Sequence, residues 1–174
     1  MDAPTRAHEI DEMLAERSIA KVLHSYARGI DRLDLALVRN CYWPDATDDH
    51  GGYTGGVDGF IEFVDRALQR FERTNHFCGN MLIDVNLAEH EARAETYCVA
   101  YHRMRDTDGK ELDMTAGLRY VDRFEERQGE WRIQRRVCAY DWRRVDYVDG
   151  DGGFADAYVR GLRSADDIVY RILD

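Results

Sequence analysis

Residues 92–105 read ARAETYCVAYHRMR, and this stretch decides the fold class. Apolar and polar side chains alternate along it, which is the period of a β-strand. The same alternation recurs in residues 77–87, 113–126 and 130–143, and only short polar segments separate these runs. Because short connections join antiparallel neighbours, the sequence predicts a meander of long antiparallel strands.

Helical periodicity characterises the first part of the chain. In residues 8–29 apolar side chains recur three and four positions apart, and Gly29 is the expected end of this helix. Similar patterns predict helices near residues 33–41 and 57–73, with a short strand and a glycine-rich loop in residues 45–56. Helices followed by a run of strands are typical of an α+β fold, in which the helices cover one face of a curved sheet and form a cone.

The chain of 174 residues has the length of one domain, which we assign to residues 1–148. Residues 149–153, Asp-Gly-Asp-Gly-Gly, predict a flexible joint. The apolar pattern of residues 154–172 predicts a C-terminal helix broken near Ser164. Residues 149–174 are therefore expected to form a loop and helix that either belong to the same domain or act as a lid or subunit arm.

Composition argues against several kinds of partner. A formal net charge of -10 at pH 7 repels nucleic-acid phosphates and anionic membranes, so neither nucleic acid nor membrane is an expected partner. No apolar leader follows Met1, and the cysteines are dispersed at Cys41, Cys78, Cys98 and Cys138. Dispersed thiols without an export signal are typical of a reducing compartment, which predicts a cytoplasmic protein.

Four polar residues lie in otherwise apolar stretches: Tyr26, Asp31, His76 and Arg136. Tyr26 is on the apolar stripe of the first helix, and Asp31 follows Gly29, where the chain can turn back. His76 stands at the start of one predicted strand and Arg136 lies within another. Brought together in a small core, a phenol, a carboxylate, an imidazole and a guanidinium form an acid–base site that needs neither metal nor cofactor.

Two of these residues also have a structural alternative. A lone histidine is more often structural than catalytic, but a carboxylate bonded to one ring nitrogen makes the other nitrogen a better base. His76 is therefore the expected base if Asp31 lies beside it. Arg136 either points into a ligand cavity or forms a surface or subunit contact, and the sequence leaves both open.

Aromatic residues and strand parity indicate a binding pocket. The ten tyrosines suit a pocket for a ring-shaped, partly polar ligand, or are ordinary half-buried strand residues. The face of residues 130–143 that carries Arg136 begins polar and becomes aromatic, as expected for a solvated rim leading into a cavity. The side chains expected to contact a ligand are Trp43, Phe63, Tyr97, Val99, Tyr101 and Tyr140.

The remaining polar clusters are interpreted as structural. Asp48, Asp49 and His50 could suggest a metal site, but they lie among glycines without a second pair of ligands, so a solvated loop is expected. His102 is expected on an outer strand face and His90 in a turn, and neither is assigned a role. No metal is predicted.

A set of short motifs carries a family resemblance. They are YARGIDRLD at residues 26–34, WPDA at 43–46, HFCGN at 76–80, GLRYVDRF at 117–124, and GEWRI at 129–133 leading to Arg135 and Arg136. Over roughly residues 10–147 the chain resembles the SnoaL-like branch of the NTF2-like superfamily of α+β cone proteins. Within this branch it is similar to the bile-acid 7α-dehydratase and hexachlorocyclohexane dehydrochlorinase groups, with scytalone dehydratase more distant.

The resemblance implies roles for the four polar residues. Asp31 and His76 fall on the positions of a His–Asp dyad that removes a proton, and Arg136 falls on a pocket arginine. Tyr26 stands where the bile-acid dehydratase has a tyrosine and the dehydrochlorinase a lysine. A pocket aspartate of the bile-acid dehydratase maps near Val99, which counts against bile-acid chemistry. Such relatives are usually trimers, so the resemblance implies a homotrimer.

Residues and resemblance together predict a cofactor-independent lyase that performs a dehydratase-type elimination on a small hydrophobic cyclic or aromatic substrate. Two alternatives remain open. A ketosteroid-isomerase-like isomerase or a polyketide cyclase would use the same pocket without losing a leaving group. The non-catalytic β subunit of an aromatic-ring-hydroxylating oxygenase shares the fold and needs no acid–base set.

Overall fold

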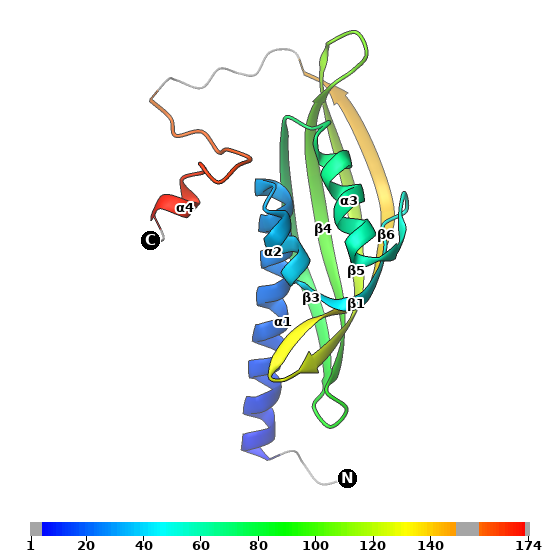
Figure 1. The fold of residues 1–174 in the computed structure, drawn as a ribbon, viewed down its shortest axis with the longest axis vertical. Helices are drawn as coiled ribbons and strands as arrows, with labels where there is room; N and C mark the ends of the chain where they lie inside the picture. Colours follow the sequence, from blue (N-terminus) through cyan, green and yellow to red (C-terminus); the bar gives the residue numbers. More distant parts are fainter. Residues whose placement is uncertain (1–4, 149–156, 173–174) are drawn as a thin grey trace.

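Long antiparallel strands form most of the sheet in the computed structural model, which describes residues 5–148 and 157–172 (Figure 1). The elements are α1 (Arg6–Arg32), α2 (Leu35–Asn40), β1 (Tyr42–Asp49), β2 (Thr54–Gly56), α3 (Val57–Leu68), β3 (Arg73–Asn86), β4 (Glu91–Arg105), β5 (Glu111–Arg127), β6 (Glu130–Tyr147) and α4 (Val169–Ile172). Among the described residues, no helix combines the length and apolar character needed to cross a membrane.

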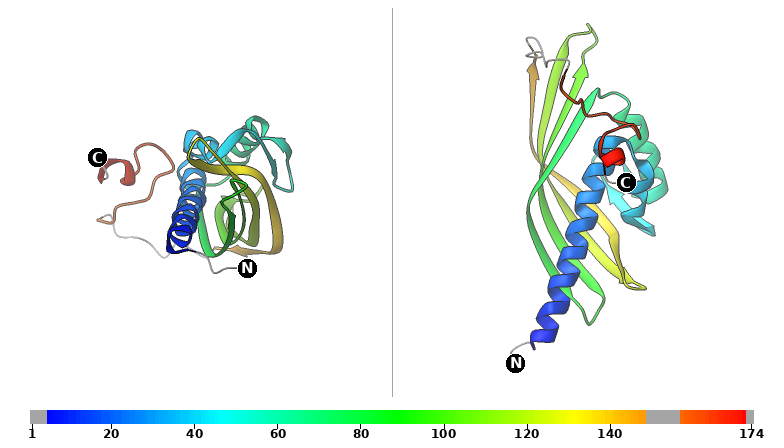
Figure 2. Two further views of the ribbon diagram at one scale, coloured as in Figure 1. Left: turned by 90° about the horizontal axis from the view of Figure 1, so that it is seen from below. Right: turned by 90° about the vertical axis from the view of Figure 1, so that its left-hand side faces the viewer.

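The sheet has six strands in the order β2-β1-β6-β5-β4-β3. The strands β3 to β6 form the predicted meander, because each pairs antiparallel with the next. The strand β1 extends the sheet by pairing parallel with β6 and antiparallel with β2. The sheet is curved, and α1, α2 and α3 lie on one side of it (Figure 2). The predicted α+β architecture is therefore confirmed.

The first helix is longer than predicted. It continues past Gly29 to Arg32, and Leu33 ends it in the left-handed region with φ 56°. Gly29 serves close packing, because a Cβ at this position would lie 2.7 Å from a methyl group of Val38 in α2. Asp31 therefore belongs to the helix, and the prediction that it follows a turn at Gly29 was wrong.

The core lies between α1 and the inner face of the sheet. Ile19, Leu23 and Tyr26 of α1 are buried there. The inward side chains of β4 are small, since every second position from Ala92 to Ala100 is alanine, threonine or cysteine. Small side chains let the helix approach the sheet and leave space beside it.

The boundary between the third helix and the third strand lies earlier in the chain than predicted. The helix α3 ends at Leu68 rather than near residue 73, because β3 already begins at Arg73. His76 is consequently inside a strand, opposite Ala100 of β4, instead of at the start of one.

The C-terminal segment is mostly irregular where the structure describes it. Its one helix there is the short α4, in place of the longer helix expected over residues 154–172. Tyr170 donates a hydrogen bond to Asp34 Oδ2 at 3.2 Å, and Arg163 donates one to the carbonyl oxygen of Leu68 at 3.1 Å. The described tail thus packs near α2 and α3. The joint predicted at residues 149–153 lies outside the described residues, and the lid or arm role stays a prediction.

Candidate active site

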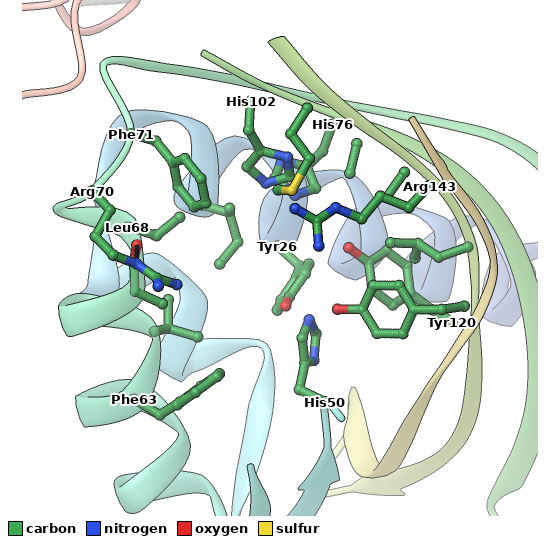
Figure 3. Close-up of a pocket in the computed structure, with 18 of the residues that line it drawn as sticks. Tyr26, His50, Phe63, Leu68, Arg70, Phe71, His76, His102, Tyr120 and Arg143 are labelled. Carbon is green, nitrogen blue, oxygen red and sulfur yellow. Dashed lines mark hydrogen bonds between the residues drawn. The ribbon is translucent and has the colours of Figure 1, made fainter. Parts of the chain in front are cut away.

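A cavity of about 580 Å³ lies between α1, α3 and the inner faces of β4, β5 and β6. A largely apolar wall into which a few polar groups converge is the usual form of a small-molecule site. Polar side chains point into it from several elements, among them Tyr26, His50 and His76 (Figure 3). The apolar wall includes Ile30, Phe63, Leu68, Phe71, Leu118 and Trp142.

His76 and Asp31 form a buried dyad. Asp31 Oδ1 lies 2.8 Å from His76 Nδ1, and Asp31 Oδ2 accepts a second hydrogen bond from the backbone N–H of His76 at 2.9 Å. Asp31 can reach β3 because it stands five residues beyond Tyr26 on α1 and so projects from a different side of the helix. The two residues that sequence analysis paired are thus in direct contact.

The dyad has a defined protonation pattern. Burial alone would raise the pKa of the Asp31 carboxyl, but the hydrogen bonds from His76 and its charge outweigh burial and lower this pKa. Asp31 is therefore ionised at neutral pH and accepts the proton on Nδ1 of His76. This leaves Nε2 of the ring as the nitrogen that can accept a proton, and His76 lines the cavity.

Tyr26 also lines the cavity, with its ring edge-on to Tyr42 and Tyr120. Burial raises the pKa of its phenol well above the ordinary value, although the Arg136 guanidinium offsets part of this effect. Tyr26 is consequently a neutral hydroxyl that can donate a hydrogen bond.

Arg136 neither lines the cavity nor reaches the surface, so neither of the two positions that the sequence left open is the observed one, and the pocket contact implied by the resemblance is not made. Its side chain is 0% exposed, and Nε and Nη2 donate to the two oxygens of Asp122 at 2.8 and 2.7 Å. The guanidinium lies 4.2 Å from the ring centroids of both Tyr26 and Tyr120. These two aromatic rings and its carboxylate partner hold Arg136 in the core behind the cavity wall.

The predicted ligand contacts divide into two groups. Phe63 of α3 and Tyr140 of β6 line the cavity, where contact with a substrate stays a prediction. Tyr97 and Val99 do not line it, because they lie on the outer face of β4 and are 48% and 43% exposed. The inward face of β4 is instead the one that carries Ala100 and His102.

Tyr101 and Trp43 are also outside the cavity. The hydroxyl of Tyr101 accepts a hydrogen bond from Arg103 at 3.1 Å, in an ion-pair cluster with Asp113. The indole of Trp43 donates from Nε1 to a main-chain carbonyl of β5 at 3.0 Å and stacks near two arginine side chains. Aromatic character did not reveal that these two half-buried side chains make their contacts outside the cavity.

A second histidine–carboxylate pair was missed. Asp48, predicted in a solvated loop, is 1% exposed in β1 and accepts from the hydroxyl of Tyr42 at 2.7 Å. Its other oxygen lies 3.1 Å from Nδ1 of His50, which lines the cavity. Residues 45–50, DATDDH, show no alternation of apolar and polar side chains, so no sequence signal indicated the buried face of β1.

The contact with the Asp48 carboxylate determines the charge of His50. Burial alone would lower the pKa of His50, but the hydrogen bond to Asp48, aided by Cys138, raises it to about 9. His50 is therefore protonated at neutral pH and is a potential proton donor on the cavity wall.

His102, predicted on an outer face, lines the cavity beside the dyad. Its ring lies edge-on to that of His76, with the centroids 5.3 Å apart, and it contacts Phe71. Burial and the neighbouring His76 lower the pKa of His102 to about 4, so its imidazole is neutral. The sequence signal that would have found it is its position two residues after Ala100, because residues two apart on a strand share a face.

The motifs of the chain correspond to a known domain. A family model for the SnoaL-like domain matches residues 11–137. The chain belongs to this family. The resemblance inferred from the short motifs is thus confirmed for this SnoaL-like protein. Among curated proteins, no sequence matches it.

Solved structures share the fold of this SnoaL-like protein. A hexachlorocyclohexane dehydrochlorinase of type 2 aligns with a TM-score of 0.71 and 15% identity over 86% of this chain and 99% of that chain. A candidate scytalone dehydratase from Novosphingobium aromaticivorans gives 0.67 and 19%, over 83% and 97% of the two chains. The β subunit of a candidate aromatic-ring-hydroxylating dioxygenase from the same organism gives 0.57 and 20%, over 75% and 92%. At these identities the likeness establishes the fold alone.

Proposed function

We propose that this SnoaL-like protein is a lyase that eliminates water from a small hydrophobic cyclic or aromatic substrate by acid–base chemistry. The observation that carries the proposal is the presence of two histidine–carboxylate pairs, His76–Asp31 and His50–Asp48, on one largely apolar cavity. The likeness to dehydratase and dehydrochlorinase structures supports it. The proposed reaction requires no bound cofactor.

His76 is the proposed base. Because Asp31 holds Nδ1 at 2.8 Å, Nε2 is left to accept a proton from a carbon next to a carbonyl or ring. The buried charge of Asp31 would also stabilise the imidazolium that forms. A positioned base of this kind accelerates proton removal by about 10²–10⁴-fold.

His50 is the proposed acid, because Asp48 keeps it protonated and it faces the same cavity. In the elimination, the electrons of the broken C–H bond form the new double bond while the C–O bond breaks. The His50 proton leaves with the oxygen as water, and His76 keeps the proton taken from carbon. Exchange with solvent then returns both histidines to their starting states.

Tyr26 is proposed to donate a hydrogen bond where negative charge grows on the substrate. A donor already directed at a developing oxyanion contributes about 10²–10³-fold in rate. Arg136 is proposed as a positioning residue, since its charge lies 4.2 Å from the Tyr26 ring and strengthens the hydroxyl as a donor without touching substrate.

Turnover of a panel of cyclic β-hydroxycarbonyl compounds, followed by mass spectrometry, tests the proposal. A dehydration product is lighter than its substrate by one water. On a substrate found in this way, His76→Ala is expected to lower kcat by about 10²–10⁴-fold. The exposed His24 of α1 provides a matched control, and His24→Ala is expected to retain wild-type kcat. Near-complete turnover by both His76→Ala and Asp31→Asn would eliminate the dyad mechanism.

Isomerisation or cyclisation is a second candidate function, favoured by the same opposed base and acid. Either reaction would move a proton from the His76 side of the substrate to the His50 side. A product of unchanged mass would assign the protein to this class.

A non-catalytic role is supported by the fold likeness to a dioxygenase β subunit. In that case the protein would bind a larger subunit, and the cavity histidines could be replaced without effect on the assembly. Purification from the native source distinguishes this role, because a tightly bound larger partner would then accompany the chain.

We also propose that the protein is a homo-oligomer, with a trimer as the expected form. The outer face of β3, β4 and β5 exposes apolar side chains that a second copy could cover. These side chains are Phe77, Leu82, Tyr97, Val99 and Val121. Light scattering measures the size of the assembly, and a monomer would contradict the proposal.

A further inference from the structure

Two arginines line the cavity without a carboxylate partner. Arg143 of β6 and Arg70, just after α3, project toward the cavity from different walls (Figure 3). In the part of the chain that the structure describes, Arg143 has no hydrogen bond or ion pair. Arg70 donates one long hydrogen bond, 3.4 Å from Nε to the carbonyl oxygen of Ala67, and contacts the ring of Phe71. Both guanidinium groups therefore retain donors for a ligand.

Acidic side chains do not neutralise these arginines. Among the described residues, Asp141 is the one carboxylate that lines the cavity, and Arg119 binds its two oxygens at 3.1 and 3.0 Å. His50 is also protonated at neutral pH, but the Asp48 carboxylate beside it balances that charge. The positive charge of the lining therefore comes from Arg70 and Arg143 and is only partly offset by Asp31. The cavity is thus positive inside a protein whose formal net charge is -10. A local charge of this sign attracts an anion that the rest of the molecule repels.

Arginines elsewhere in the fold show that acidic partners are abundant. Arg103 pairs with Asp113 at 2.8 Å, and Arg127 pairs with Asp45 at 2.7 Å. Arg144, the next residue after Arg143, pairs with Asp146 at 2.8 Å. In the described part of the chain, the exposed Arg17 and Arg135 are also unpaired, but neither lines the cavity. Arg143 is exposed as well and differs from them in lining the cavity, where a ligand carboxylate can supply the missing partner.

We propose that the cavity takes a substrate in which a hydrophobic ring carries a carboxylate, and that Arg143 binds this carboxylate. The proposal deepens the proposed function and rests on it for the identity of the site. The planar fork of guanidinium donors matches the two oxygens of a carboxylate. The apolar wall accommodates the ring, which then lies between His76 and His50. The carboxylate orients the substrate and takes no part in bond breaking.

Binding of matched probes tests the proposal. The aromatic acid 2-naphthoate and its neutral amide, 2-naphthamide, have nearly the same shape and differ in charge. Isothermal titration calorimetry is expected to show wild-type protein binding the acid at least about tenfold more tightly, because charge-assisted hydrogen bonds are roughly twice as strong as neutral ones. Arg143→Met is expected to abolish this preference. Arg144→Met is the matched control, because that side chain is 71% exposed and already paired.

The outcomes separate this proposal from the lyase proposal. Equal affinity of the two probes for wild type, or a preference that survives Arg143→Met, would overturn the assignment of Arg143. Loss of the preference in Arg144→Met as well would also overturn it, since a general charge effect would then suffice. His76→Ala is expected to keep the preference for the acid. Normal turnover in His76→Ala with that preference intact would overturn the lyase mechanism and leave the binding assignment standing.

Discussion

The charge on His50 is expected to make the stability of the fold depend on pH. Asp48 holds Nδ1 of His50 at 3.1 Å and raises its pKa to about 9, compared with 6.5 for an unperturbed histidine. A pKa that is higher in the folded state favours folding whenever the proton is bound. This contribution is fully present below pH 6.5 and is lost as pH rises through 9.

The size of the effect follows from the two pKa values. A difference of one pKa unit corresponds to about 1.4 kcal/mol, so a rise from 6.5 to about 9 contributes about 3 kcal/mol. The side chain of His50 is 16% exposed, so solvent screens little of this interaction. About 3 kcal/mol is a large share of the free energy of unfolding of a domain of this size.

Urea unfolding of wild type and His50→Gln at about pH 6 and about pH 9.5 measures the effect. The difference in free energy of unfolding between the two proteins is expected to be about 3 kcal/mol smaller at the alkaline pH. In an Asp48→Asn background, His50→Gln is expected to lose this pH dependence, because the carboxylate that raises the pKa is absent. A difference that stays constant, or grows, between the two pH values would refute the argument.

Three further predictions concern packing and hydrogen bonding. Asp122→Asn leaves the buried guanidinium of Arg136 without its charged partner and is expected to cost about 3–5 kcal/mol in urea unfolding, so a loss below about 1 kcal/mol would contradict the pairing. Gly117→Ala places a Cβ 2.1 Å from Nε1 of Trp142, so the indole must move. The substitution is expected to lower the free energy of unfolding by about 1–3 kcal/mol and to shift the tryptophan fluorescence, and unchanged emission would contradict this packing. Asp34→Ala removes the N-cap of α2 and is expected to lower the free energy of unfolding by about 1 kcal/mol. Calorimetry measures this as a lower melting temperature, and an unchanged melting temperature would show that the cap is not needed.

Local patterns determined the architecture. The period of two in residues 92–105 and its neighbours, with short polar connections, was sufficient for the antiparallel meander. The same patterns failed where packing overrides them. Gly29, a helix stop by propensity, lies inside α1 because α2 packs against its bare backbone.

The site was predictable in part for the same reason. Tyr26, Asp31 and His76 stood out in the sequence because polar residues rarely occupy such positions without a partner. Alternation shows that a strand has two faces but not which face is inside. This is why Tyr97 was expected in the cavity and His102 outside it.

The sequence by itself determined the α+β meander and named the histidine and aspartate that form the dyad. Only the tertiary structure decided that Arg136 lies behind the cavity wall and that His50 and Arg143 line the cavity. The physical reason is that the curvature of the sheet and the position of the helices set which strand face surrounds empty space. These features arise from contacts between residues far apart in the chain, which no local periodicity records.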